Sequence, residues 1–123
     1  MLRLVVAAGA MLALPTLALA QDAEAGKKIF ASKCVACHAV PGPSAKNQAG
    51  PNLTGVIGRK AGTAEGFNYS DAMKAAGWVW DEATFKEYIT DPKKKVPGNK
   101  MLFPGLKDEL DRDSVYAYLS SVK

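Results

Sequence analysis

The hydrophobic and polar positions of this chain follow helical spacing once an apolar N-terminal stretch has passed. From Asp22 to Lys33 acidic residues precede basic ones, the order that the helix dipole favours, and Phe30 lies one turn before Cys34. Asp22 is also a suitable N-cap residue. The pattern predicts a first helix over residues 22–33.

Two shorter helices are predicted in the middle of the chain. Ser70 can cap a helix that runs through Ala76 and ends at Gly77. Asp81 can cap another helix, which ends at Asp91-Pro92. Its apolar positions repeat at the i, i+3, i+4 spacing of one helix face and are Phe85, Tyr88 and Ile89.

The last predicted helix carries one apolar face, formed by Val115, Tyr118, Leu119 and Val122. Residues 39–62 and 93–106 are rich in proline and glycine, show no sustained period and are expected to be loops. Loops of this length are uncommon in a compact domain unless something organises them. We expect an all-α single domain of helices and long loops, with no strands.

The N-terminal residues have the pattern of a secretory signal peptide. A single positive charge at Arg3 precedes an apolar run over residues 4–14 and the small-residue end Ala18-Leu19-Ala20. We expect cleavage after Ala20, which divides the chain into a signal peptide (1–20) and a periplasmic domain (21–123). The alternative is a retained membrane anchor, although the stretch barely reaches the ~20 residues that span a bilayer.

The segment Cys34-Val35-Ala36-Cys37-His38 is the attachment signature of covalent c-type haem, and His38 is the single histidine of the chain. Two cysteines three residues apart on a helical turn project from one face, so both thiols can add to vinyl groups on one edge of a porphyrin. His38 can then turn its imidazole toward the iron. We expect one haem c per chain, bound by two thioether bonds.

Other uses of the C-x-x-C spacing fit less well. A tetrahedral zinc site needs four protein ligands, whereas Cys34, Cys37 and His38 supply three and no other cysteine or histidine exists. A thioredoxin-like dithiol is typical of a βαβ setting, but the surrounding residues have a helical pattern. A plain structural disulfide is the remaining alternative.

The second iron ligand is expected to be a methionine. The chain has four methionines, and Met1 and Met11 leave with the signal peptide. Met73 falls in a short predicted helix, where a methionine is more often core filler. Met101 falls in a loop rich in proline and glycine, whose backbone can aim a thioether at a metal, so the pattern favours Met101. Iron held by histidine and methionine is the electron-transfer arrangement, whereas an open position suits ligand binding.

Charge is informative here through its distribution. The formal net charge is +4, and loss of Arg3 lowers it by one. Lysines gather near the cysteine motif and around Met101: Lys33, Lys46, Lys93, Lys94, Lys95, Lys100 and Lys107. Acidic residues gather near the last helix: Asp108, Glu109, Asp111 and Asp113. We expect a monomer with a charge dipole, no nucleic-acid partner, and no stable membrane insertion after cleavage.

Ordered motifs accompany the cysteine motif along the whole of residues 21–123. They are Gly26-Lys27-Lys28-Ile29-Phe30, Gly50-Pro51-Asn52-Leu53, Gly58-Arg59-Lys60, Gly66-Phe67-Asn68-Tyr69, Trp80, Tyr88, Pro97-Gly98-Asn99-Lys100-Met101 and Ala117-Tyr118-Leu119. With this set the chain resembles the class I c-type cytochromes, of the bacterial cytochrome c2 type related to mitochondrial cytochrome c. The resemblance implies the class I cytochrome c fold, with helices and long loops wrapped around one covalently attached haem.

The resemblance implies roles for residues around the histidine and the propionates. The Pro51 carbonyl is expected to accept a hydrogen bond from the free ring nitrogen of His38. Tyr69 and Trp80 are expected to donate to a buried propionate, with Arg59 as the nearby countercharge. From spacing alone the two aromatic residues fit an ordinary core, and Arg59 fits a solvated surface charge.

Two further contacts are implied. Tyr88 is expected to approach the Met101 sulfur, although its spacing also fits a core position. Gly26 and Tyr118 are expected to meet where the first and last helices cross, with the glycine making room for the aromatic ring.

Two positions depart from the family pattern. Met73 stands where relatives commonly have a polar residue near a buried water, and Asn99 stands where threonine is usual. Neither is one of the expected ligands His38 and Met101.

The resemblance implies a soluble periplasmic one-electron carrier, not an enzyme, that shuttles electrons between membrane respiratory or photosynthetic complexes. The expected partners have acidic docking faces: a cytochrome bc1-type donor, and an oxidase, reaction centre or periplasmic reductase as acceptor. Lys93, Lys94, Lys95 and Lys100 would steer such encounters. Two alternatives stay open, namely a haem enzyme or gas sensor with an open iron position and a haem subunit docked permanently in a larger complex.

Overall fold

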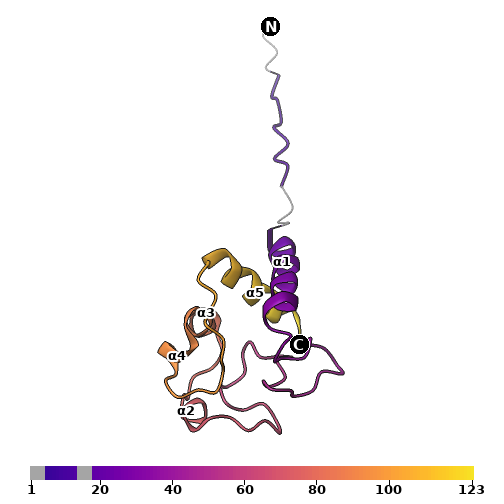
Figure 1. Cartoon of the computed structure of the whole chain (residues 1–123). Helices are drawn as coiled ribbons and strands as arrows, with labels where there is room; N and C mark the ends of the chain where they lie inside the picture. The colour runs from indigo at the N-terminus through magenta and orange to yellow at the C-terminus, as the bar shows by residue number, and fades with distance from the viewer. Residues whose placement is uncertain (1–4, 14–17) are drawn as a thin grey trace.

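The computed structural model describes residues 5–13 and 18–123. It contains five helices: α1 (Ala18–Lys33), α2 (Asp71–Lys74), α3 (Glu82–Thr90), α4 (Pro92–Lys95) and α5 (Glu109–Ser121) (Figure 1). Within these residues there is no strand, and one isolated bridge joins Lys60 to Val79. The predicted all-α class is confirmed.

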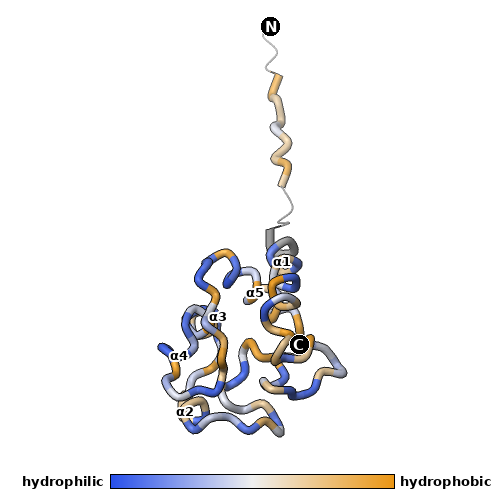
Figure 2. The backbone as a smooth tube through the Cα atoms, viewed as in Figure 1, coloured by the Kyte–Doolittle hydropathy of each residue, from blue (hydrophilic) through white to orange (hydrophobic). Residues whose placement is uncertain are grey.

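Residues 5–13 run away from the helical body and carry apolar residues that touch little else (Figure 2). Val5 and Met11 in this segment are 89% and 101% exposed. In the part of the chain that is described, no helix has both the length and the apolar character needed to cross a membrane.

Helices α1 and α5 pack side by side and form the largest helix–helix contact (Figure 1). A Cβ added at Gly26 would overlap the Ser114 carbonyl and the Cβ of Tyr118, so only glycine allows this approach. Next to it the buried Phe30 ring meets Tyr118 edge-on, with 5.6 Å between ring centroids. The contact implied for Gly26 and Tyr118 is therefore confirmed.

Helix α1 begins at Ala18, four residues before the predicted start. The expectation that Asp22 caps the helix is wrong for this chain, because Asp22 lies inside α1. The residues before it, Ala18-Leu19-Ala20-Gln21, are good helix formers and extend the helix when they are present.

Helices α2 and α3 begin at the predicted caps. The Ser70 hydroxyl accepts from the Met73 amide at 3.1 Å, and Asp81 Oδ1 accepts from the Thr84 amide at 2.8 Å. The Thr84 hydroxyl accepts from the Asp81 amide in return at 3.0 Å, which completes a capping box. Helix α2 ends earlier than predicted, at Lys74, with Ala75 as its C-cap.

Residues 93–95 are helical, so the loop predicted over 93–106 begins too early. Asp91 ends α3 and also caps α4, since its Oδ1 accepts from the Lys94 amide at 3.3 Å. Pro92 occupies the first helical position, where its missing N–H is not needed, and its side chain is fully buried.

The predicted apolar face of α5 is confirmed for Val115, Tyr118 and Leu119, which are buried. Val122 lies just beyond the last turn, as the C-cap residue. Asp108 caps the start of the helix by accepting from the Asp111 amide at 3.2 Å.

The long connection over residues 39–62 is organised by polar side chains that bond to the main chain. Asn47 Oδ1 accepts from the Asn52 amide, and Asn47 Nδ2 donates to the Glu65 carbonyl, both at 2.8 Å. The Thr54 hydroxyl accepts from the Gly42 amide at 2.9 Å. These bonds hold the loop in a defined shape beside the site described next.

Candidate functional site

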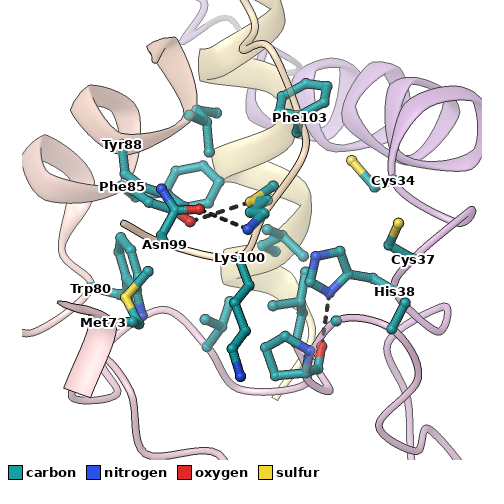
Figure 3. A pocket seen from close by; sticks show the side chains of 18 of the residues that line it. Cys34, Cys37, His38, Met73, Trp80, Phe85, Tyr88, Asn99, Lys100 and Phe103 are labelled. Carbon is teal, nitrogen blue, oxygen red and sulfur yellow. Dashed lines mark hydrogen bonds between the residues drawn. The ribbon is translucent and has the colours of Figure 1, made fainter. Parts of the chain in front are cut away.

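A largely apolar cavity of about 430 Å³ opens between the helices and the long loops. Cys34, Cys37 and His38 lie on one side of it, and Tyr88 and Asn99 lie across from them (Figure 3). Its volume is in the range typical of cofactor pockets. All nine residues predicted to bind a cofactor line it: Cys34, Cys37, His38, Pro51, Arg59, Tyr69, Trp80, Tyr88 and Met101.

The two cysteines follow directly from the end of α1. The Cys34 amide still bonds to the Phe30 carbonyl at 2.9 Å, and the Cys37 and His38 amides both bond to the Cys34 carbonyl, at 3.1 and 2.9 Å. This tight turn brings both thiols to the edge of the cavity (Figure 3). Burial raises the pKa of the Cys34 thiol to about 11, with a smaller opposing effect from Lys33, whereas Cys37 is exposed.

His38 is buried, and its Nδ1 lies 2.8 Å from the Pro51 carbonyl oxygen. Because a carbonyl only accepts, Nδ1 carries the proton and donates, which leaves the lone pair on Nε2. Burial lowers the pKa of His38 from its usual 6.5, and the Pro51 bond opposes that shift. The imidazole is therefore held neutral with Nε2 free, the form in which histidine binds a metal.

Gly50 makes room for this ring. A Cβ at position 50 would overlap Cε1 of His38 and lie within 2.8 Å of both ring nitrogens. The Gly50 amide also donates to the Cys37 carbonyl at 2.7 Å, which ties the loop to the cysteine turn. The glycine and its neighbour Pro51 together fix the orientation of the imidazole.

Met101 lies on the other side of the cavity in the loop after α4. The Tyr88 hydroxyl donates to its sulfur at 3.3 Å, as the resemblance implied. Burial raises the pKa of Tyr88 to about 12, so the phenol keeps its proton at neutral pH. The thioether is therefore oriented by a donor that stays protonated at neutral pH.

Met73 also lines the cavity, and its side chain is buried in the same apolar cluster as Trp80. Its thioether has no hydrogen bond in the described part of the chain, unlike that of Met101. The two methionines thus differ in what orients them, and both remain within the cavity.

Residues 23–123 match the family model described as cytochrome c. The chain belongs to the cytochrome c family. It is 64% identical over 104 residues to cytochrome c2 of Rhodoblastus acidophilus, covering 85% of this chain and 95% of that relative. It is 57% identical over 100 residues to a cytochrome c2 of Rhodoplanes tepidamans, covering 81% and 92%.

A solved structure leads to the same family. Cytochrome cH from Methylobacterium extorquens is 50% identical and superimposes with a TM-score of 0.75, covering 81% of this chain and 98% of that one. The class I cytochrome c fold and the cytochrome c2 type expected from the motifs are confirmed. Cytochromes of this family carry electrons and are not enzymes, and they bind haem c covalently through cysteine. In this chain Cys34 and Cys37 are the two cysteines.

The cavity of this cytochrome fits a haem in its polar groups as well as in its volume. Arg59 lines the cavity and donates to the Thr54 and Asn52 carbonyls at 3.3 and 3.1 Å. Its Nε is buried and has no partner among the described residues. A buried donor on a cation is costly to leave unpaired, so this wall suits an anionic group such as a propionate.

Tyr69 and Trp80, the expected propionate donors, both line the cavity. The Tyr69 hydroxyl accepts from the Ala64 amide at 2.9 Å, which leaves its own proton available to donate. Trp80 packs against Tyr88, with 5.0 Å between ring centroids. Their expected bonds to a propionate stay predictions.

Two residues of the site had no role assigned from the sequence. Gly50 stood in a quoted motif, but its closeness to the His38 ring depends on two segments meeting in space. Asn99 was noted only as a departure from threonine, although it is buried and its side chain bonds to the main chain on both sides of the loop. A polar residue inside a loop rich in proline and glycine is the one signal that pointed to it.

Proposed function

We propose that this cytochrome is a soluble periplasmic one-electron carrier whose haem iron is held by His38 and Met101. The observation that carries the proposal is the Tyr88 hydroxyl, which orients the Met101 sulfur in the cavity that also contains a neutral, buried His38. Ligation by histidine and methionine is typical of electron-transfer haem proteins.

The chain's own residues prepare the cavity for this work. Haem, when bound, supplies an iron that gains and loses one electron. The Pro51 carbonyl fixes the His38 ring, and Cys34 and Cys37 fix the porphyrin edge. The apolar walls exclude water, so little of the surroundings has to reorganise when the charge changes. Met101, which Tyr88 already orients, would supply the second ligand to the iron, whereas an enzyme or gas sensor would leave that position open.

Partner docking is proposed at the rim of the cavity. Lys33 and Lys100 line the cavity and are exposed, and Lys93 and Lys94 are exposed in α4. Such lysines attract acidic surfaces and accelerate encounter. We propose a cytochrome bc1-type donor and an oxidase, reaction centre or periplasmic reductase as acceptor, in interfaces under ~1,200 Å² that allow rapid release.

Export is proposed to separate residues 1–20 from the domain by cleavage after Ala20. The exposed apolar segment that precedes the domain supports this proposal. Fractionation of cells, followed by mass measurement of the periplasmic protein, tests it. A product that retains residues 1–20 and sediments with membranes would favour an anchored form instead.

Ligation is tested by a pair of methionine variants. Met101→Ala is expected to abolish the methionine-to-iron charge-transfer absorption, lower the reduction potential and let added imidazole bind the ferric protein. Met73→Leu is the control, since it changes the other cavity methionine and should leave all three properties nearly unchanged. Loss of the absorption in Met73→Leu with Met101 intact would overturn the assignment.

A further inference from the structure

Asn99 is a buried polar side chain, 5% exposed, placed two residues before the proposed ligand Met101. Both ends of its amide are used. Its Nδ2 donates to the Pro92 and Val96 carbonyls, at 2.9 and 2.8 Å, and its Oδ1 accepts from the Met101 amide at 2.8 Å. One side chain therefore joins both ends of α4 to the main chain of Met101.

The loop beyond Asn99 has little else to define its path. Across residues 100–105, the Met101 amide makes the one main-chain hydrogen bond found in the described part of the chain. Regular pairing resumes at Leu106, whose amide donates to the Ile89 carbonyl at 2.7 Å. The register of Met101 between these two points rests on Asn99, on the Tyr88 contact to its sulfur and on Lys100, whose Nζ donates to the Asn68 carbonyl at 3.4 Å from an exposed position.

Helix α4, to which Asn99 bonds, is well packed against the rest of the domain. Pro92 is fully buried and Val96 is 4% exposed. Lys95, in the last turn of α4, pairs with Glu87 at 2.9 Å and lies 4.7 Å from the centre of the Trp78 ring. Because α4 is held in place in this way, the Asn99 side chain bonded to it can hold the main chain of Met101 in a defined position.

We propose that Asn99 is a positioning residue that clamps the Met101 loop to α4 and thereby sets how readily the Met101 thioether leaves the iron. The proposal rests on the ligation proposed above. When a bound methionine dissociates, its loop must move, and the clamp opposes that movement because three hydrogen bonds to main-chain groups, two of them buried, would be strained or broken. A looser loop favours displacement by any competing ligand.

The chemistry of the side chain defines the test variants. Asn99→Leu keeps the branched shape and the number of heavy atoms, although its methyl groups are bulkier than the amide oxygen and nitrogen, and it removes all three bonds. Asn99→Thr keeps a hydroxyl that can accept from the amide two residues on, as serine and threonine do in turns, but it has a single proton to donate. Thr84→Val is the matched control, since it removes side-chain to main-chain bonds of the α3 capping box without changing a residue that lines the cavity.

The experiment measures imidazole affinity of the ferric haem protein and hydrogen exchange of the Met101 amide. Asn99→Leu is expected to bind imidazole at least about tenfold more tightly, equivalent to ~1.4 kcal/mol, and to lose about tenfold in Met101 amide protection. Asn99→Thr should have an imidazole affinity and a Met101 amide protection between those of Asn99→Leu and those of the parent protein. Thr84→Val should lower the global stability. After correction for that loss, its imidazole affinity and its Met101 amide protection should equal those of the parent protein.

Separate outcomes bear on the clamp and on the ligation. Parental imidazole affinity and amide protection in Asn99→Leu would overturn the clamp, as would equal changes in Thr84→Val. If Asn99→Leu does not fold, Asn99→Thr gives the same reading, and parental values there would overturn the clamp. A parent protein without the methionine-to-iron absorption would overturn ligation by Met101, and the amide exchange would still decide whether Asn99 holds the loop.

Discussion

The two sides of the cavity are built by different means. On the histidine side, Cys34, Cys37 and His38 lie within five consecutive residues, and main-chain bonds that continue from α1 hold them. On the methionine side, Met101 lies in a loop whose main chain is almost unpaired, and Leu102 next to it is 88% exposed. Its placement depends on Asn99 and Tyr88, which come from the adjoining turn and from α3.

This difference indicates that His38 is harder to displace from its position than Met101. A displacement of His38 must disturb the turn that carries both cysteines. A displacement of Met101 needs only a few side-chain hydrogen bonds to break, and each of these can be removed separately by substitution. We therefore expect variants on the histidine side to act on folding and haem attachment, and variants on the methionine side to act on ligand exchange and potential.

The largest expected effect is on the histidine side. Gly50→Ala places a Cβ against the His38 ring and should cost about 3 kcal/mol in the free energy of unfolding, since overpacking a rigid site has costs of this order. The imidazole would move away from the Pro51 carbonyl. Urea unfolding and the NMR signal of the His38 Nδ1 proton measure the two effects.

Gly26→Ala is the comparison for that variant. Its added Cβ overlaps Ser114 where α1 meets α5, away from the His38 ring. It should lower stability while leaving the His38 proton signal in place. An unchanged His38 signal in Gly50→Ala would show that the glycine does not control the imidazole.

On the methionine side, stability should depend on alkaline pH through Tyr88. Burial raises the pKa of Tyr88 from 10.0 to about 12 in the folded protein. The unfolded chain therefore loses this proton first. The contribution of Tyr88 to the free energy of unfolding is thus complete below pH 10 and disappears as the pH rises through 12. This difference between the Tyr88 pKa of the folded and unfolded states corresponds to roughly 2–3 kcal/mol in the free energy of unfolding. Urea unfolding of the parent and of Tyr88→Phe from pH 8 to 12 should show a decline that the variant lacks.

A smaller effect is expected from Tyr88→Phe at neutral pH. Removing the hydroxyl deletes the bond to the Met101 sulfur, which should cost roughly 0.5–1.5 kcal/mol in stability. If Met101 holds the iron as proposed, its sulfur would give more electron density to the metal, which would favour the oxidised state and lower the reduction potential. Voltammetry measures that shift, and the His38 Nδ1 proton signal should not move. A raised potential would contradict the role given to this hydrogen bond.

The smallest effect on the molecule itself is expected from charge reversal at the rim. Lys93→Glu with Lys94→Glu should leave stability and potential almost unchanged because both side chains are exposed and neither lines the cavity. The pair should slow association with a cytochrome bc1-type complex and flatten its salt dependence, since screening acts over ~8 Å at physiological ionic strength. Stopped-flow rates at several salt concentrations measure this. Lys27→Glu with Lys123→Glu is the control, and equal losses from both pairs would exclude a localised docking face.

Helices were predictable from the sequence where local signals agree. Ser70 and Asp81 mark the starts of α2 and α3 through caps that act within a few residues. The predicted helix boundaries were wrong where the flanking residues also favour a helix. Helix α1 begins before Asp22 because the preceding residues are helix formers too. Helix α4 was not predicted, and it forms because Asp91 both ends α3 and caps α4. Boundaries depend on such competition, whereas an amphipathic face such as that of α5 is already evident in the pattern.

The sequence by itself determined the cysteine turn and His38, because their chemistry depends on spacing along one helical turn. It also determined the family, through motifs in a fixed order. Only the tertiary structure decided that Gly50 leaves room for the His38 ring, that the buried Arg59 Nε has no partner among the described residues, and that Asn99 joins α4 to Met101. The contact between Gly50 and His38 arises where two separate segments meet in space. The Asn99 bonds span only residues 92–101, but they depend on the path of an irregular loop, which no periodic pattern encodes.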